Sequence, residues 1–79
     1  GDMLCQAAVQ LAARSLKPLL VEDGLQDPVF AIDPYVQKKQ VRSLLVLPLV
    51  NQGKLSALLY LENGLAPKVF TPQRVHILT

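Results

Sequence analysis

Two apolar runs separated by a short polar turn, within residues 41–63, constrain the fold more than any other feature of the sequence. Each run has the length of a β-strand, and Asn51-Gln52-Gly53-Lys54 stands between them. Gly53 can take the positive φ angle that a tight turn needs. The segment is therefore predicted to be a β-hairpin with a loop of two or three residues.

Both faces of this hairpin carry apolar side chains. A strand with one solvated side alternates apolar and polar residues, so this pattern predicts strands that lie centrally, with material on both sides. Pro48 has no N–H for the ladder and predicts a bulge or an unpaired position. If Val50 lies opposite Lys54, one face holds Leu45, Leu47, Leu49, Leu55, Ala57, Leu59 and Leu61, and the other holds Leu44, Val46, Val50, Leu58 and Tyr60.

The length and composition of the chain limit its class. Its 79 residues allow at most one small domain of marginal stability. Charged residues make up 18%, fewer than the ~25% typical of globular domains, which suggests a chain that associates or that belongs to something larger. The net charge of +2 is scattered and gives no indication of nucleic-acid binding. With no membrane-helix or signal-peptide pattern, a cytoplasmic location is expected.

The flanking segments predict helices and one further strand. Residues 3–16 show helical spacing, with Asp2 as the N-cap and Pro18 ending the helix. Residues 19–21 read as a short strand, and residues 24–34 as a loop. Asp33 and Pro34 predict the start of a short helix over residues 34–40. Thr71 before Pro72 predicts a last helix, which Thr79 is expected to cut short.

This order of features resembles the C-terminal half of a GAF domain, of the type found in multidomain bacterial sensor histidine kinases. The resemblance covers nearly all of the chain and is carried by residues 18–23 (PLLVED), 42–49 (RSLLVLPL), 58–63 (LLYLEN) and 70–72 (FTP). It implies an α+β fold, with a central β-hairpin in an antiparallel sheet and helices packed on it. It also implies that residues 1–79 are a single partial domain, which lacks the first helix and first two strands of the usual domain.

The resemblance implies a non-catalytic sensory or regulatory module of a two-component signal-transduction histidine kinase. Such a module would act through a small-molecule ligand, through dimerisation, or through both. A homodimer formed through the sheet edge or the helices is expected, because part of the usual sheet is missing. The alternatives are a ligand-free dimerisation scaffold, a GAF module of a transcription regulator and, less favoured, an enzyme of the methionine-sulfoxide-reductase type, which would need a second cysteine.

The family's ligand pocket lies between the sheet and the loop that precedes the hairpin. The resemblance therefore makes four residues candidates for a ligand pocket: Phe30, Ile32, Tyr35 and Val36. Lys38, Lys39 and Arg42 form a small basic cluster, which is either a solvated helix end or a site for an anionic ligand.

Other reactive side chains predict no catalytic, cofactor or metal site. Cys5, the single cysteine, lies on the apolar stripe of its helix and is expected to be a buried, inert thiol. His76 lacks an acidic neighbour and a second histidine, so it is expected to be a surface or half-buried helix residue. Asp23, Asp27, Asp33 and Glu62 stand at turns and strand ends, where capping and solvation explain them.

Overall fold

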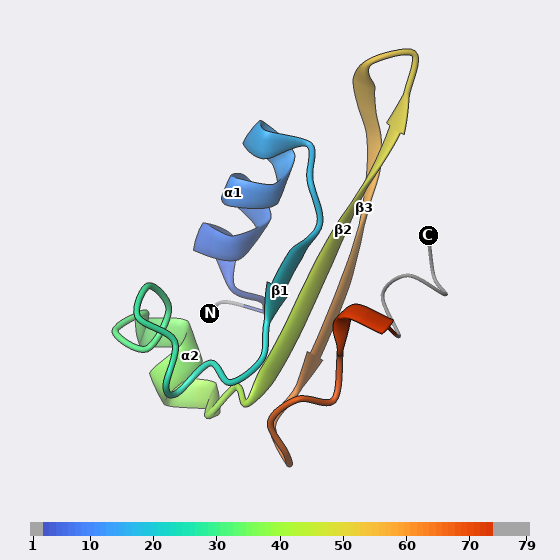
Figure 1. Cartoon of the computed structure of the whole chain (residues 1–79). Helices are drawn as coiled ribbons and strands as arrows, with labels where there is room; N and C mark the ends of the chain where they lie inside the picture. The colour runs from blue at the N-terminus through green and yellow to red at the C-terminus, as the bar shows by residue number, and fades with distance from the viewer. Residues whose placement is uncertain (1–2, 74–79) are drawn as a thin grey trace.

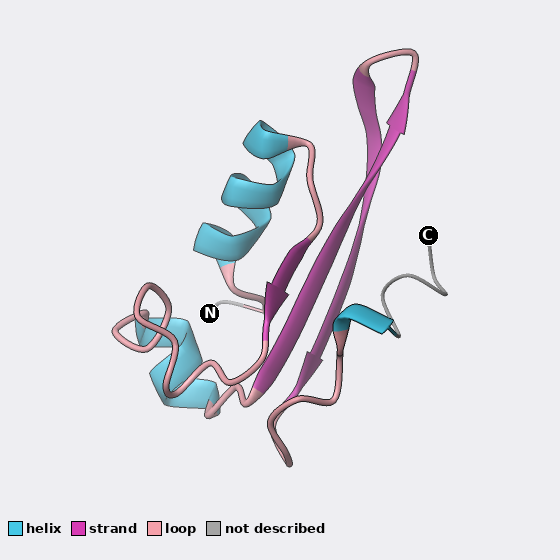
Figure 2. Cartoon of the chain, in the orientation of Figure 1, coloured by secondary structure: helices cyan, strands magenta, loops and turns pink. Residues whose placement is uncertain are grey.

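The structure of this chain is a computed structural model, which describes residues 3–73. Its elements follow one another as α1 (Gln6–Ser15), β1 (Leu19–Val21), α2 (Pro34–Lys39), β2 (Ser43–Asn51) and β3 (Lys54–Asn63). The strands form an antiparallel sheet in the order β1-β2-β3, so β2 is the central strand (Figure 1, Figure 2). The predicted α+β architecture, with the hairpin at its centre, is confirmed.

The hairpin closes through a two-residue turn. Asn51 pairs with Lys54, while Gln52 and Gly53 between them have φ angles of 55° and 76°. Positive φ at both central residues is the signature of a type I′ turn, whose twist matches that of the flanking strands.

The register of the hairpin differs from the predicted one. Val50 pairs with Leu55 rather than with Lys54, and Leu49 pairs with Ala57. Ser56 is therefore an extra residue in β3, which makes a β-bulge and sends Leu55 to the opposite face from the one predicted. The physical cause is the two-residue turn. It fixes how residues pair at the tip of the hairpin, independently of how the rest of β2 pairs with β3. The bulge lies beyond Pro48, which is itself placed opposite Leu58.

The two faces of the sheet are covered by different parts of the chain. On one face, Leu44 and Val46 of β2 join a buried cluster with Val21 of β1 and with Ala8 and Ala12 of α1. On the other face, Leu45 and Leu47 are 0% and 3% exposed. Figure 1 shows α1 and α2 on one side of the sheet and the segment after β3 on the other. The prediction of cover on both faces is thus confirmed for the lower half of β2.

The upper part of the hairpin does not have this cover. Leu49, Val50, Leu55 and Leu59 are 39–51% exposed, and the tip extends past α1 in Figure 1. Within residues 3–73, β2 is the central strand, and β3 pairs with β2 alone.

The first helix begins later than predicted. Cys5 is the N-cap of α1 and makes no side-chain capping hydrogen bond, whereas the predicted cap, Asp2, lies outside the described residues. The helix ends at Ser15, and the C-cap Leu16 has left-handed φ and donates its N–H to Ala12 O at 2.9 Å. Small residues on its buried face, Ala8 and Ala12, allow the helix to lie close to the sheet.

The second helix begins as predicted. The Asp33 carboxylate accepts hydrogen bonds from the N–H groups of Tyr35 and Val36, at 2.9 and 3.2 Å. Pro34 occupies the first helical position, where its missing N–H costs nothing. These contacts fix the direction in which Tyr35 leaves the helix.

One serine hydroxyl fixes the path of the chain after β3. Ser43 Oγ donates to Ala66 O at 2.7 Å and accepts from Val69 N at 3.1 Å, while Lys68 N donates to Glu22 O at 2.7 Å. Pro72 and Gln73 then begin a helical turn after Thr71, as predicted. The rest of the predicted helix, which includes Val75, His76 and Leu78, lies outside the described residues.

Candidate functional site

Two tyrosines and one carboxylate meet where α2 faces β3. The hydroxyl groups of Tyr35 and Tyr60 both donate to Glu62 Oε1, at 2.7 and 2.8 Å. Tyr35 comes from α2, while Tyr60 and Glu62 alternate along β3 and so lie on the same face of the sheet. We refer to Tyr35, Tyr60 and Glu62 as the Glu62 cluster.

The Glu62 cluster also reaches the start of α1. The N–H of Cys5, the N-cap residue, donates to the Tyr60 hydroxyl oxygen at 2.8 Å. The carbonyl oxygen of Met3 lies 3.2 Å from the Tyr35 hydroxyl oxygen. Three elements that are distant in sequence are thus joined by one set of polar side chains.

Burial raises the pKa of both phenols in the cluster. For Tyr35, burial and then the hydrogen bond and negative charge of Glu62 raise the pKa from 10.0 to about 12. For Tyr60, burial is again the largest cause and Glu62 adds to it, so its pKa is also raised. Both phenols are therefore neutral donors at physiological pH, and the carboxylate is their shared acceptor.

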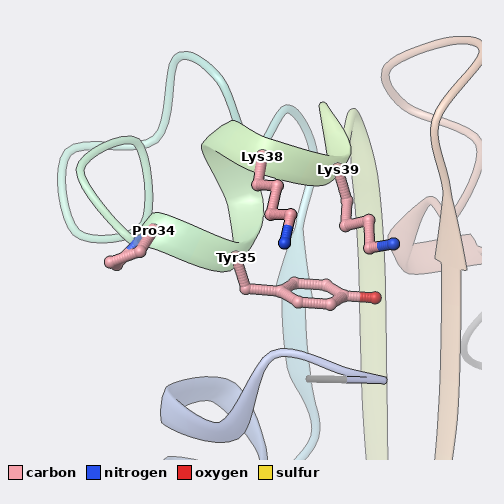
Figure 3. A pocket seen from close by; sticks show the side chains of 4 residues that line it. All are labelled: Pro34, Tyr35, Lys38 and Lys39. Carbon is pink, nitrogen blue, oxygen red and sulfur yellow. The ribbon is translucent and has the colours of Figure 1, made fainter. Parts of the chain in front are cut away.

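A small hollow lies beside the ring of Tyr35. Pro34, Tyr35, Lys38 and Lys39 line it, and its volume is about 90 Å³. Figure 3 shows the side chains of Lys38 and Lys39 running from α2 toward the Tyr35 ring. Neither ammonium group has an ion-pair partner within residues 3–73. The hollow is much smaller than the roughly 300–1,000 Å³ of sites for drug-sized ligands.

A larger hollow of about 340 Å³ opens beside α1, at Gln10, Ala13 and Arg14. It lies on the flank of the helix. Its described lining has a single charged side chain and none of the aromatic or acidic groups of the Glu62 cluster.

The four candidate pocket residues separate into two groups. Phe30, Tyr35 and Val36 are 4%, 9% and 0% exposed and belong to the buried core, whereas Ile32 is 80% exposed. Of the four, Tyr35 alone lines either of the two described hollows.

The predicted basic cluster is divided. Arg42 makes a two-point ion pair with Asp23, at 3.1 and 3.2 Å, and so does not join Lys38 and Lys39 around the hollow. The hydrogen bond from Arg42 lowers the pKa of the Asp23 carboxyl and raises that of the guanidinium. This pair connects the turn after β1 with the start of β2.

The family model described as "GAF domain" matches residues 1–79. The chain belongs to the GAF domain family. This membership agrees with the resemblance that the order of its motifs suggested.

A relative of this GAF domain is the "Hybrid signal transduction histidine kinase G" of Dictyostelium discoideum, which is 41% identical over 75 residues. The match covers 95% of this chain and 2% of that protein. The chain thus spans a small fraction of the relative's length.

The remaining candidates for reactive side chains in this GAF chain are Cys5, His76 and possible metal ligands. Cys5 is buried, and burial raises the pKa of its thiol, which disfavours the nucleophilic thiolate. His76 lies outside the described residues. No group of three or more metal-ligating side chains is found within residues 3–73, and none of the described helices is long and apolar enough to cross a membrane.

Sequence reasoning missed the Glu62 cluster. It treated Glu62 as a solvated strand end and Tyr60 as one apolar residue of a strand face. A signal was available, because a tyrosine and a glutamate two residues apart on one strand share a face. What the sequence alone could not give was the approach of Tyr35 from a helix 27 residues away in sequence.

Proposed function

We propose that this chain forms part of a regulatory GAF module of a signal-transduction histidine kinase and is not itself catalytic. The observation that carries the proposal is the 41% identity to a segment of a hybrid signal transduction histidine kinase over 95% of this chain. The raised pKa of the buried Cys5 thiol is consistent with a regulatory role, because it opposes the cysteine chemistry of the reductase alternative.

The sensory element of this proposal is the hollow beside Tyr35. Its two lysines present positive charge to a small anionic group, such as the carboxylate or phosphate of a metabolite. Tyr35 lines the hollow and also donates to Glu62, at 2.7 Å. A ligand that moves the Tyr35 ring would therefore change the contacts of β3 and, through Tyr60, of the α1 N-terminus.

The regulatory role is tested in a chimera. The matching segment of the Dictyostelium kinase is replaced by residues 1–79 of this chain, and the rate of histidine autophosphorylation is measured. Substituting Lys38→Ala together with Lys39→Ala should change this rate by about fivefold or more if the hollow biases the output. The matched control is Lys17→Ala together with Lys68→Ala, which removes the same charge elsewhere and should leave the rate unchanged. Equal rates in both double variants would contradict the proposal.

A second measurement separates a ligand-binding sensor from a ligand-free scaffold. Native mass spectrometry of the 79-residue chain, purified from cells, should show a reproducible added mass that the Lys38→Ala, Lys39→Ala variant lacks. A chain with no added mass, in a chimera that still responds to the lysine substitutions, would favour the scaffold.

A further inference from the structure

Asn63, the last residue of β3, is followed by Gly64 at the point where the chain leaves the sheet. Gly64 is exposed and has no side chain, so its backbone nitrogen can approach the Asn63 side chain closely. A five-membered ring closes when that nitrogen attacks Cγ of the asparagine. This pair is therefore a place where the chain can modify itself, if the fold leaves the nitrogen available.

The fold does not engage the backbone N–H of Gly64. Within residues 3–73 this N–H donates to no acceptor. A similar pair, Asp23-Gly24, has the opposite environment, because Gly24 is buried and donates its N–H to Arg42 O at 2.9 Å. That nitrogen would have to break a hydrogen bond before it could react. Of the two pairs, Asn63-Gly64 is the one with an available nucleophile.

Two further backbone N–H groups point at the side-chain oxygen of Asn63. Leu65 N and Ala66 N donate to Asn63 Oδ1, at 2.8 and 3.1 Å. Attack on Cγ places negative charge on this oxygen, and preorganised donors at such distances stabilise a developing oxyanion. The turn thus holds the reacting carbonyl with its stabilising donors already in place.

We propose that Asn63 is a site of spontaneous deamidation in the folded chain, with water as the co-reactant. The Gly64 nitrogen loses its proton to hydroxide and bonds to Asn63 Cγ. The Cγ–Nδ2 bond then breaks, and Nδ2 takes a proton from water and leaves as ammonia, which regenerates the hydroxide. Water next opens the succinimide ring. Opening at Cγ gives aspartate, and opening at the backbone carbonyl carbon gives isoaspartate, in which the main chain runs through the former side chain.

Both products alter the segment after β3. Each adds one negative charge, which lowers the formal net charge from +2 to +1. Isoaspartate also inserts one extra atom into the main chain before Ala66, whose carbonyl oxygen accepts from the buried Ser43 hydroxyl at 2.7 Å. The isoaspartate form should therefore loosen the attachment of this segment to β2. The site is separate from the hollow beside Tyr35, and the inference does not depend on the regulatory role.

The test follows Asn63 in the folded 79-residue chain, kept at mildly alkaline pH. Trypsin releases residues 55–68, LSALLYLENGLAPK, in which Asn63 is the one residue with a side-chain amide. Mass spectrometry should show a growing fraction of this peptide with NH₂ replaced by OH, which chromatography separates into aspartate and isoaspartate forms. The rate should rise with hydroxide concentration. The peptide of residues 43–54, in which Asn51 precedes Gln52, should stay unmodified over the same time.

Three variants test the roles of the nitrogen and of the donors. Gly64→Ala should slow the reaction about tenfold or more, because a methyl group hinders the approach of the nitrogen. Its Cβ would lie 3.5 Å from Gln40 O, an ordinary contact that should not prevent folding. Leu65→Pro removes one N–H donor and should slow the reaction about tenfold, whereas Leu65→Ala keeps that N–H and should react as the natural chain does. Circular dichroism checks that each variant is folded.

A synthetic peptide of residues 55–68 separates the effect of the fold from that of the sequence. The peptide contains the same Asn-Gly pair without donors held in place, so the folded chain should convert at least as fast. This comparison measures the donors independently of Leu65→Pro. Three results would overturn the proposal: an unmodified Asn63 in the folded chain, a folded chain that converts more slowly than the peptide, or equal rates in folded Leu65→Pro and Leu65→Ala.

Discussion

Glu62 receives a hydrogen bond from each of the two tyrosines of the chain, and Tyr60 in turn receives the N–H of Cys5. The arrangement satisfies a backbone donor at the start of α1 that a capping side chain would otherwise satisfy. In a capping box, the side chain of the third helical residue accepts from the N–H of the N-cap residue; here the Tyr60 hydroxyl, from a different element, accepts from the N–H of the N-cap Cys5. The Glu62 cluster therefore stabilises the attachment of α1 to the sheet.

Removing the Tyr60 hydroxyl should destabilise the fold. In Tyr60→Phe, the buried Cys5 N–H loses its acceptor, which costs about 1–3 kcal/mol of unfolding free energy. Urea unfolding followed by circular dichroism measures the loss. Glu62→Gln is the control, because its amide oxygen can still accept a hydrogen bond and the loss should be smaller. A Tyr60→Phe variant as stable as the natural chain would show that Cys5 N–H is satisfied in another way.

The raised tyrosine pKa values predict a loss of stability at alkaline pH. A folded-state pKa of about 12 for Tyr35, against 10.0 for an ordinary phenol, means that folding favours the neutral form. The corresponding stability is complete below about pH 10 and falls as the pH rises toward 12. Tyr60, whose pKa is also raised, acts in the same direction. Phenolate absorbance should therefore appear together with the loss of circular dichroism, and titration near pH 10 in a folded chain would contradict the prediction.

Among the elements, the β2–β3 hairpin depends most on residues that are close together in sequence. Its turn residues, Gln52 and Gly53, both have positive φ, although glutamine is a poor residue for that conformation. A Cβ atom at Gly53 would meet no heavy atom within 4 Å, so an alanine there would be disfavoured by its backbone angle and not by a collision.

Turn substitutions should change stability in opposite directions. Gly53→Ala should cost about 1 kcal/mol, because alanine is strained at a φ of 76°. Gln52→Asn should stabilise the chain by a few tenths of a kcal/mol or more, because asparagine tolerates left-handed φ and is preferred in type I′ turns. The midpoint temperatures of thermal unfolding of the two variants and of the natural chain test this prediction. If both variants melt at the natural temperature, the turn does not limit stability.

At the scale of the whole molecule, the central strand is buried on both faces. Leu44 belongs to the buried cluster that includes α1, Leu45 is on the opposite face of the strand, and both are 0% exposed. A chain of this size has a small core, in which each fully buried leucine matters.

Leu44→Ala and Leu45→Ala should therefore destabilise the protein to a similar extent. Each removes a buried side chain and leaves a cavity, at a cost of about 2–5 kcal/mol. Small domains have little stability to spare, so either variant should be largely unfolded at physiological temperature. Circular dichroism at increasing temperature tests this. A Leu45→Ala variant that is clearly more stable than Leu44→Ala would show that the face under the last segment contributes little.

The features of this fold that depend on neighbouring residues were predicted from the sequence, whereas those that depend on contacts between distant residues were not. The hairpin, the Asp33 cap of α2 and the double burial of β2 follow from turn chemistry and from alternation along the chain. The bulge at Ser56 did not follow, because it arises from a mismatch between two registers that are separately favourable. The Glu62 cluster did not follow either, because it depends on a hydrogen bond between Tyr35 of α2 and Glu62 of β3, which are 27 positions apart. Ile32, which the family resemblance made a pocket candidate, is 80% exposed, and its part in a pocket stays a prediction.

The bond from Cys5 N–H to the Tyr60 hydroxyl spans 55 positions of the chain, whereas the hairpin turn joins neighbours. Short loops close fastest, and hairpins form in about 1–10 μs. We therefore expect the hairpin to assemble early and the docking of α1 through Tyr60 to complete folding. Gly53→Ala should then mainly slow the folding rate, and Tyr60→Phe should mainly speed unfolding. The long-range hydrogen bond would in that case govern how long the native state persists, and the turn how quickly it is reached.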